Sequence, residues 1–141
     1  MKGLIATGIL ALGVAAFAMT GPAGAAKAGL AIGTWLHPDN GSHIRISRCG
    51  GGICGTVVRV RDRSRTDINN KDPKLRKRKI LGLRLFSGMK KDRKDRWKGK
   101  LYNTADGGTY RGFVTVISKS KIKLEGCWGP FCKSKTWTRV R

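Results

Sequence analysis

The sequence predicts an all-β protein, either an antiparallel barrel or a sandwich, with about eight short strands. Short apolar or alternating segments recur along the chain and are separated by residues that favour turns. No amphipathic helical pattern of any length follows Ala25. A closed barrel is the more attractive of the two architectures, because closure removes the unpaired strand edges that an open sheet exposes.

The N-terminal segment Met1–Ala25 is predicted to be an export signal and not part of the domain. Lys2 gives it a positive start, residues 4–19 are apolar without a charge, and Ala23-Gly24-Ala25 is the small-residue pattern that signal peptidase recognises. A transmembrane anchor needs ~20 apolar residues, and this run is shorter. We therefore expect residues 26–141 to form one periplasmic or secreted domain that is not transmembrane once the signal is cleaved.

The first three predicted strands are joined by turn-forming residues. A run of turn formers from His37 to Gly41 ends the first strand. In the second strand Ile44 and Ile46 share one face and polar residues share the other, which is the pattern of a half-buried strand. We expect these strands at Gly33–Leu36, His43–Arg48 and Cys54–Arg61.

A long charged segment, Asp62–Lys79, follows the third strand and is expected to be a loop. It is too polar for a core strand and is interrupted by Pro73, so at most one helical turn is expected after that proline. Ser87–Arg96 is also strongly charged and is expected to be a second basic loop. The remaining strands are expected at Ile80–Phe86, Trp97–Asn103, Tyr110–Ile117, Ile122–Cys127 and Thr136–Arg141.

The chain is very basic, with a formal charge of +22 whose excess is concentrated between residues 61 and 100. Such a field attracts polyanions, including anionic lipid, lipopolysaccharide, acidic glycan and nucleic acid. The simpler interpretation is a solvated surface that keeps a small protein soluble. Export argues against nucleic acid as the partner.

Four cysteines form two C-x4-C pairs, Cys49 with Cys54 and Cys127 with Cys132. An even number of cysteines in an exported chain predicts two disulfides, with three possible connectivities. Glycines inside the first pair and Gly129-Pro130 inside the second permit tight reversals, which favours the two local bridges, while the crossed pairing stays open. A four-thiolate zinc site is the alternative, but its usual spacing is C-x2-C.

Few residues suited to catalysis are present. His37 and His43 are the only histidines, Glu125 is the only glutamate, and no serine-hydrolase, zinc-protease or phosphate-loop motif occurs. We therefore expect no enzymatic activity, no cofactor and no metal. A hydrolase that uses Asp67 or Asp72 is the catalytic alternative, and it lacks a matching motif.

The segment Thr66–Lys79 concentrates more specific polar side chains than any other stretch. Asp67, Asn69 and Asp72 invite comparison with a calcium loop, in which acidic and amide oxygens alternate. Lys71 takes the fifth ligand position and no later glutamate completes the site. The comparison with a calcium loop therefore fails.

Arg76 and Arg78 follow Asp67 and Asp72 closely in the sequence. Such groups more often make an internally salt-bridged loop than a binding site, because a charged loop over a barrel mouth needs such pairs to hold a shape. If the loop covers the mouth, the same arginines could grip a carboxylate or phosphate on a ligand. The candidate ligand-binding residues are Asp67, Asn69, Asp72, Arg76, Arg78, Trp97, Tyr102 and Tyr110.

Aromatic side chains recur along the predicted strands, and core packing is their expected role. A barrel of about eight strands is also the size that can just hold one small ligand. Some of these rings are therefore candidates for the wall of a cavity. The aromatic residues are Trp35, Trp97, Tyr102, Tyr110, Phe113, Trp128 and Trp137.

Several separated motifs resemble the pattern of a bacterial protein family. They include Gly33-x-Trp35, Asp67-x-Asn69-x-x-Asp72-Pro73-x-x-Arg76-x-Arg78, Trp97-x-Gly99-x-x-Tyr102-Asn103, Leu124-x-Gly126-Cys127 and Trp137-Thr138-Arg139. Together they are similar to an uncharacterised domain of unknown function found in small exported proteins of Gram-negative bacteria. The resemblance implies a single antiparallel, lipocalin-like β-barrel, and it implies no established activity, ligand or catalytic residue.

The leading hypothesis is an exported lipocalin-like protein that binds a small amphipathic or anionic molecule, with apolar strand faces lining a cavity and Asp67–Arg78 ordering its rim. The alternative is an envelope or host-interaction protein that binds polyanions such as lipopolysaccharide, anionic lipid or acidic glycan. It would use two basic loops, Arg76–Lys79 and Lys90–Lys100. Salt separates the two, because screening weakens binding between exposed charges and hardly affects a buried apolar ligand.

Overall fold

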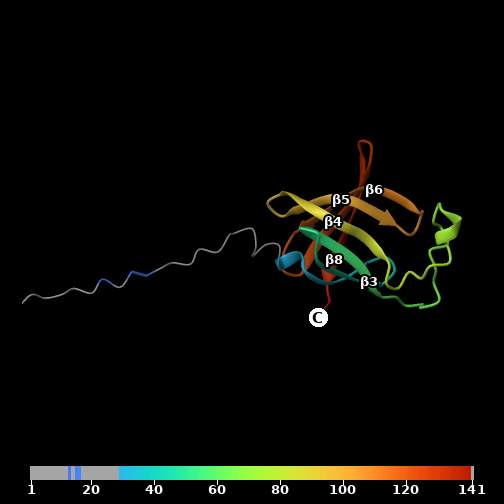
Figure 1. Cartoon of the computed structure of the whole chain (residues 1–141), viewed down its shortest axis with the longest axis horizontal. Coiled ribbons are helices and arrows are strands. Elements are labelled where there is room, and N and C mark those ends of the chain that lie inside the picture. Colours follow the sequence, from blue (N-terminus) through green and yellow to red (C-terminus); the bar gives the residue numbers. More distant parts are fainter. Residues whose placement is uncertain (1–12, 14, 17–28, 141) are drawn as a thin grey trace, which may run out of the picture.

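The chain forms a closed antiparallel β-barrel in a computed structural model (Figure 1). The structure describes residues 13, 15–16 and 29–140. The predicted export signal, Met1–Ala25, lies almost wholly outside the described residues and stays a prediction. Within the described part of the chain, no helix is long and apolar enough to cross a membrane.

Each strand pairs with the next in sequence, and the last strand pairs with the first. A short helical turn at residues 29–31 precedes them. The strands are β1 (Gly33–Leu36), β2 (His43–Cys49), β3 (Gly52–Arg59), β4 (Arg84–Arg93), β5 (Arg96–Asn103), β6 (Gly108–Val116), β7 (Lys121–Trp128) and β8 (Phe131–Arg139). The prediction of a single antiparallel barrel of about eight strands is therefore confirmed.

Strand β4 corrects the prediction of a basic loop at Ser87–Arg96. The strand pairs with β5, so that Lys91 lies opposite Trp97. Of its ten residues only Phe86 and Met89 are buried, and the charged side chains stay in solvent. The high charge of this segment does not prevent strand formation. An antiparallel strand with one face in water can pair with its neighbours while burying few apolar residues.

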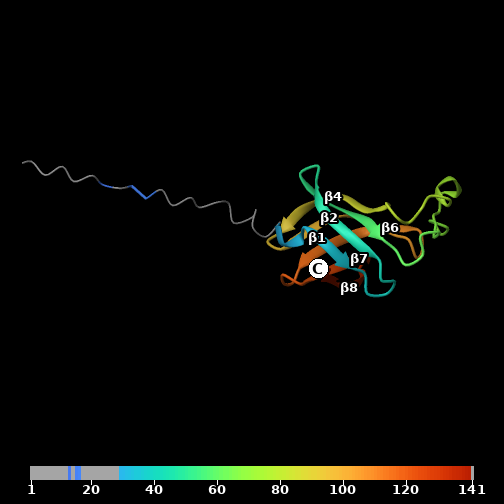
Figure 2. The ribbon, with the colours of Figure 1, turned by 90° about the horizontal axis from the view of Figure 1, so that it is seen from below.

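The two ends of the barrel are built differently. The β1–β2, β3–β4, β5–β6 and β7–β8 connections lie at one end, which we call the open end. The helical turn and the three remaining connections lie at the other, which we call the closed end. Figure 2 shows the long β3–β4 connection and the helical turn on opposite sides of the barrel.

Arg139, near the C-terminal end of β8, seals the closed end. Its guanidinium carbon lies 4.3 Å from the centroid of the Trp35 ring. The same group donates hydrogen bonds to the main-chain carbonyls of Leu30, Ile32 and Lys119. This one side chain therefore connects the helical turn and the β6–β7 connection to the closed end of the barrel.

Both residues of the motif Gly33-x-Trp35 are needed for the contacts of Arg139 at the closed end. The Trp35 side chain is fully buried, and its indole N–H donates to the Ala31 carbonyl at 2.9 Å. Gly33 adopts a φ of +146°, and a Cβ built there would lie 2.2 Å from a guanidinium nitrogen of Arg139. A side chain at residue 33 would therefore displace the arginine.

The two disulfides predicted from the cysteine count are present. The structure joins Cys49 to Cys54 across the β2–β3 turn and Cys127 to Cys132 across the β7–β8 turn. These are the two local bridges that the spacing favoured. Each bridge fixes one tight reversal of the chain.

The expectation that Trp128 packs in the core is wrong. Trp128 is 75% exposed and Phe131, on the other side of the β7–β8 turn, is 72% exposed. Trp128 lies on the same face of β7 as Ile122 and Leu124, but it is the last residue of the strand and lies past the final β6–β7 pair, Arg111 with Cys127, so no neighbouring strand on that side covers its ring. Ile122 and Leu124 of the same strand face inward, as predicted.

Candidate functional site

The β3–β4 connection, residues 60–83, forms a rim loop beside the open end of the barrel. Its two arms meet at a neck, where Thr66 bridges to Lys79 and the Ile80 N–H donates to the Arg65 carbonyl at 3.1 Å. The single helical turn expected after Pro73 is the 3₁₀ turn η1 (Pro73–Leu75). The neck therefore holds both ends of the loop together next to the barrel.

Asp67 is the buried anchor of this rim loop. Its carboxylate accepts hydrogen bonds from the Asn70 amide at 2.8 Å, the Tyr102 hydroxyl at 2.7 Å and the Arg78 Nε at 2.9 Å. A second guanidinium nitrogen of Arg78 lies 2.8 Å from the same carboxylate oxygen, so two nitrogens of the arginine contribute to the ion pair. Because Tyr102 belongs to β5, this cluster fixes the loop to the barrel wall.

The environment of the cluster shifts two pKa values in opposite directions. Burial alone would raise the pKa of the Asp67 carboxyl, but the hydrogen bonds from Asn70, Tyr102 and Arg78 outweigh it and leave the pKa lowered. Burial and the bond to Asp67 raise the pKa of the Tyr102 hydroxyl. At neutral pH the pair is therefore a carboxylate that accepts from a phenol.

The other predicted residues of the loop serve its own architecture. The Asn69 amide donates to the carbonyls of Thr104 and Ala105 in the β5–β6 turn, at 3.3 and 3.1 Å. Asp72 caps η1 by accepting from the Lys74 N–H. The Arg76 Nε donates to the main-chain carbonyl of Asn70 at 2.8 Å, inside the loop.

A cavity of about 600 Å³ opens at this end of the barrel. Its inner wall is apolar and comes from the inward faces of β2, β3, β5, β7 and β8. The apolar wall residues are Ile44, Val57, Leu101, Leu124 and Trp137. Its mouth carries the polar side chains of Arg65, Asp39, Asn103, Asp106, Lys133 and Lys135, together with the exposed rings of Trp128 and Phe131.

Two nitrogen-bearing rings meet in the wall of this cavity. The His37 and Trp137 ring centroids are 5.4 Å apart. Trp137 is 1% exposed, and its indole N–H is the only fully buried side-chain polar atom without a hydrogen-bond partner in the described residues. Such a donor is costly to leave unpaired, and the ring that carries it lines the cavity.

His37 adds a second donor beside the indole. Burial lowers the pKa of His37, with Asp39 opposing and Lys135 reinforcing the shift, so the ring is neutral at pH 7. Its Nδ1 accepts from the Asp39 main-chain N–H at 3.2 Å. The proton of the neutral ring is therefore on Nε2, which makes this atom a hydrogen-bond donor.

The structure brings some of the predicted ligand-binding residues together and separates others. Tyr102 and Tyr110 line the cavity. The loop contributes Arg65 and Ile80 from its neck to the lining. Trp97 is buried at the other end of β5, opposite Val114, and is not a lining residue. The remaining candidates, Asp67, Asn69, Asp72, Arg76 and Arg78, lie outside the lining and stabilise the loop beside the mouth.

The sequence does not mark His37 and Trp137 as ligand-binding residues. It predicts Trp137 in the core and His37 in a turn, and the structure confirms both positions. What the sequence lacks is a signal for the distance between them, because they are 100 residues apart and meet only when β8 closes against β1. In residues 29–140 no three acidic, histidine or cysteine side chains are grouped so that they could hold a metal ion.

Comparison with known proteins agrees with this geometry. A solved structure from Helicobacter pylori, the protein HP1028 described as belonging to the lipocalin family, superposes with a TM-score of 0.67 at 27% identity, over 79% of this chain and 83% of that one. No curated protein matches the chain. Residues 33–139, which span the whole barrel, match the model of a family described as uncharacterized proteins conserved in bacteria (DUF2147). The chain therefore belongs to the DUF2147 family, with a lipocalin-like barrel as its fold.

Proposed function

We propose that this protein is an exported carrier or sensor that binds one small amphipathic molecule inside its barrel and catalyses no reaction. The observation that supports the proposal is the cavity of about 600 Å³, which lies within the range of ~300–1,000 Å³ that small-molecule sites occupy. The arrangement is an apolar inner wall with a mouth that carries charged side chains. Two local disulfides fit an oxidising compartment, which supports export.

The polar atoms of the wall restrict the chemistry of the ligand. The Trp137 N–H has no partner within the barrel and the His37 Nε2–H is available as a second donor, so the ligand should present an acceptor such as a carboxylate, an ester or an amide oxygen. The apolar residues around them suit a hydrocarbon body. Three cations at the mouth, Arg65, Lys133 and Lys135, favour a ligand that is neutral or anionic.

The test is a fluorescence titration with amphiphiles of one chain length that differ only in their end group. Carboxylate and amide ends should bind more tightly than the bare hydrocarbon, because only they can satisfy the indole and imidazole donors. Equal binding of all three would contradict the assigned acceptor, and a broad panel without any binder would contradict the function.

A pair of variants tests the location of the ligand. Leu124→Trp fills the cavity from β7, so the affinity for the best amphiphile should fall at least tenfold, about 1.4 kcal/mol. Thr136→Trp adds the same ring to the exposed side of β8 and should leave the affinity unchanged. A Leu124→Trp protein that melts cooperatively and still binds like the parent would show that the ligand lies elsewhere.

A further inference from the structure

The β7–β8 hairpin ends in an exposed aromatic pair, Trp128 and Phe131, which we call the aromatic tip. Figure 1 shows this hairpin projecting from the body of the barrel. Both rings are more than two thirds exposed, whereas Trp35, Trp97 and Trp137 are almost completely buried. Two large apolar side chains exposed to water do not contribute to the stability of the folded domain. Their exposure side by side is typical of an interaction surface.

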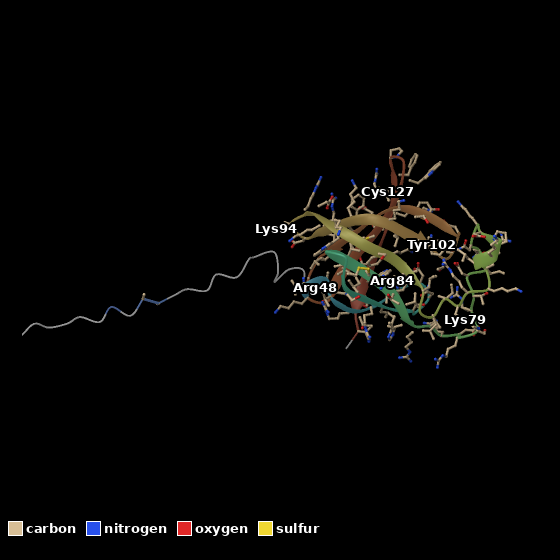
Figure 3. All side chains as sticks on the ribbon, in the orientation of Figure 1. Arg48, Lys79, Arg84, Lys94, Tyr102 and Cys127 are labelled. Atoms are coloured by element: carbon tan, nitrogen blue, oxygen red, sulfur yellow. A yellow bond between two sulfur atoms is a disulfide. The ribbon has the colours of Figure 1, made fainter. Side chains whose placement is uncertain are left out.

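The tip is held in a fixed shape. The Cys127–Cys132 disulfide closes the hairpin directly beneath the aromatic pair, and the Arg111 guanidinium donates to the Gly129 carbonyl in the turn at 3.3 Å. Figure 3 labels Cys127 at the base of the projecting hairpin. A rigid hairpin loses little conformational freedom when its end enters another phase.

The charges around the tip select the kind of partner. Lys133, Lys135 and Arg111 surround it, and Lys71 lies with Trp128 along a shallow groove. The nearest carboxylates are engaged: Asp39 pairs with Lys135, and Asp106 accepts from Tyr110. Glu125, further along β7, lies opposite Ser134. The surface near the tip therefore keeps a positive excess.

We propose that the aromatic tip inserts into the interface of an anionic lipid layer while the neighbouring cations contact the headgroups. Tryptophan and phenylalanine on a basic background are the side chains that bind such interfaces, and each nearby lysine or arginine adds ~1 kcal/mol at an anionic surface. Trp128 and Phe131 also line the mouth of the cavity. Docking through the tip thus places that mouth against the lipid from which an amphiphile would enter or leave.

This surface differs from both basic loops expected from the sequence, since Arg76–Lys79 lies in the rim loop and not on the β7–β8 hairpin. The predicted loop at residues 90–100 is the β4–β5 hairpin, which turns at the closed end of the barrel. The aromatic tip lies at the open end. Docking does not rest on the proposed ligand, because an empty barrel presents the same tip.

Trp128 supplies its own reporter, since it is the exposed tryptophan of the barrel. The full chain is mixed with vesicles of phosphatidylcholine containing phosphatidylglycerol and, separately, of phosphatidylcholine alone. We expect a blue shift of the tryptophan emission and protection from acrylamide with the anionic vesicles, both reduced by added salt. Binding without a change at Trp128 would overturn the proposal, because another part of the chain would then carry it.

Matched variants complete the test. Trp128→Ser with Phe131→Ser should weaken vesicle binding at least tenfold, whereas Ile117→Ser, an exposed apolar residue at the closed end, should not. Lys133→Gln should weaken binding to anionic vesicles and leave the weak binding to neutral vesicles unchanged. A blue shift that appears with rising protein concentration and no vesicles would identify a second copy of the chain as the partner, and no shift with any vesicle would point to a protein; either result overturns the lipid assignment.

Discussion

Asp67 has no exposed surface, yet it is charged, because three side chains satisfy its carboxylate. Its sequence neighbourhood predicted the bond to an arginine of the same loop, and Arg78 makes it. The bond from Tyr102 could not be predicted, since β5 reaches the loop only in the folded barrel. A residue selected as a ligand contact therefore proves to be the anchor of the loop beside the cavity.

Tyr102→Phe tests this anchor. The substitution removes the hydroxyl that donates to Asp67 and accepts from the Asn70 amide at 3.1 Å. It leaves a buried carboxylate short of one donor, so the free energy of unfolding should fall by ~1–2 kcal/mol. Urea denaturation measures the change.

Tyr110→Phe is the matched control for that measurement. The Tyr110 hydroxyl donates to the exposed carboxylate of Asp106, which water can solvate instead. Its loss should change the free energy of unfolding by less than ~0.5 kcal/mol. Equal losses in the two variants would contradict the role assigned to Tyr102.

At the scale of elements, the rim loop and the β5–β6 turn form one unit. Asn69 donates to two carbonyls of the turn, and Gly107 in the turn lies against the main chain of the loop. Gly107 has a φ of +71°, and a Cβ built there would lie 1.9 Å from the Asn69 carbonyl oxygen. The hairpin signal at Asp106-Gly107-Gly108 predicted the turn and not this contact.

Gly107→Ala should therefore destabilise the barrel more than the same change at a glycine with free space. Gly129 provides the control, because its φ is +56° and nothing lies within 4 Å of a Cβ built there. Gly129→Ala should cost ~1 kcal/mol of unfolding free energy for its backbone conformation alone, and Gly107→Ala at least ~1 kcal/mol more. Thermal melts of the two variants measure the difference, and equal midpoints would show that the loop does not press on the turn.

At the scale of the whole molecule, the barrel is closed by a short seam. Strands β1 and β8 pair only at Trp35 with Arg139 and at Leu36 with Thr138. Beyond the seam, Lys135 of β8 forms a 3.1 Å ion pair with Asp39 of the β1–β2 loop, where both side chains are more than half exposed. Such an exposed pair adds little stability, so the contacts of Arg139 with Trp35 and with the helical turn should contribute more to closure than this pair does.

Arg139→Lys should weaken this closure. A lysine ammonium cannot reach three carbonyls with the fixed fork of a guanidinium or stack as well on Trp35, so we expect a loss of ~2–3 kcal/mol of unfolding free energy. Arg45→Lys, on the exposed face of β2, should change it by less than ~0.5 kcal/mol. Chemical denaturation compares the two variants. An Arg139→Lys protein as stable as the parent would show that Arg139 does not stabilise the closure of the barrel.

Features that depend on near neighbours in the chain can be predicted from the sequence: the shared face of Ile44 and Ile46, the tight turns, and the bridges between cysteines five positions apart. Which side chains from distant segments come into contact depends on the folded barrel. Charged β4 forms a strand because its neighbours pair with it, Trp128 faces water because β7 extends past its last pair with β6, and Trp137 meets His37 because β8 closes on β1. Alternation along a strand predicts which of its residues share a face. The pairing of strands from distant parts of the sequence decides which other side chains that face contacts. The cavity, its hydrogen-bond donors and the aromatic tip therefore arise only in the folded barrel.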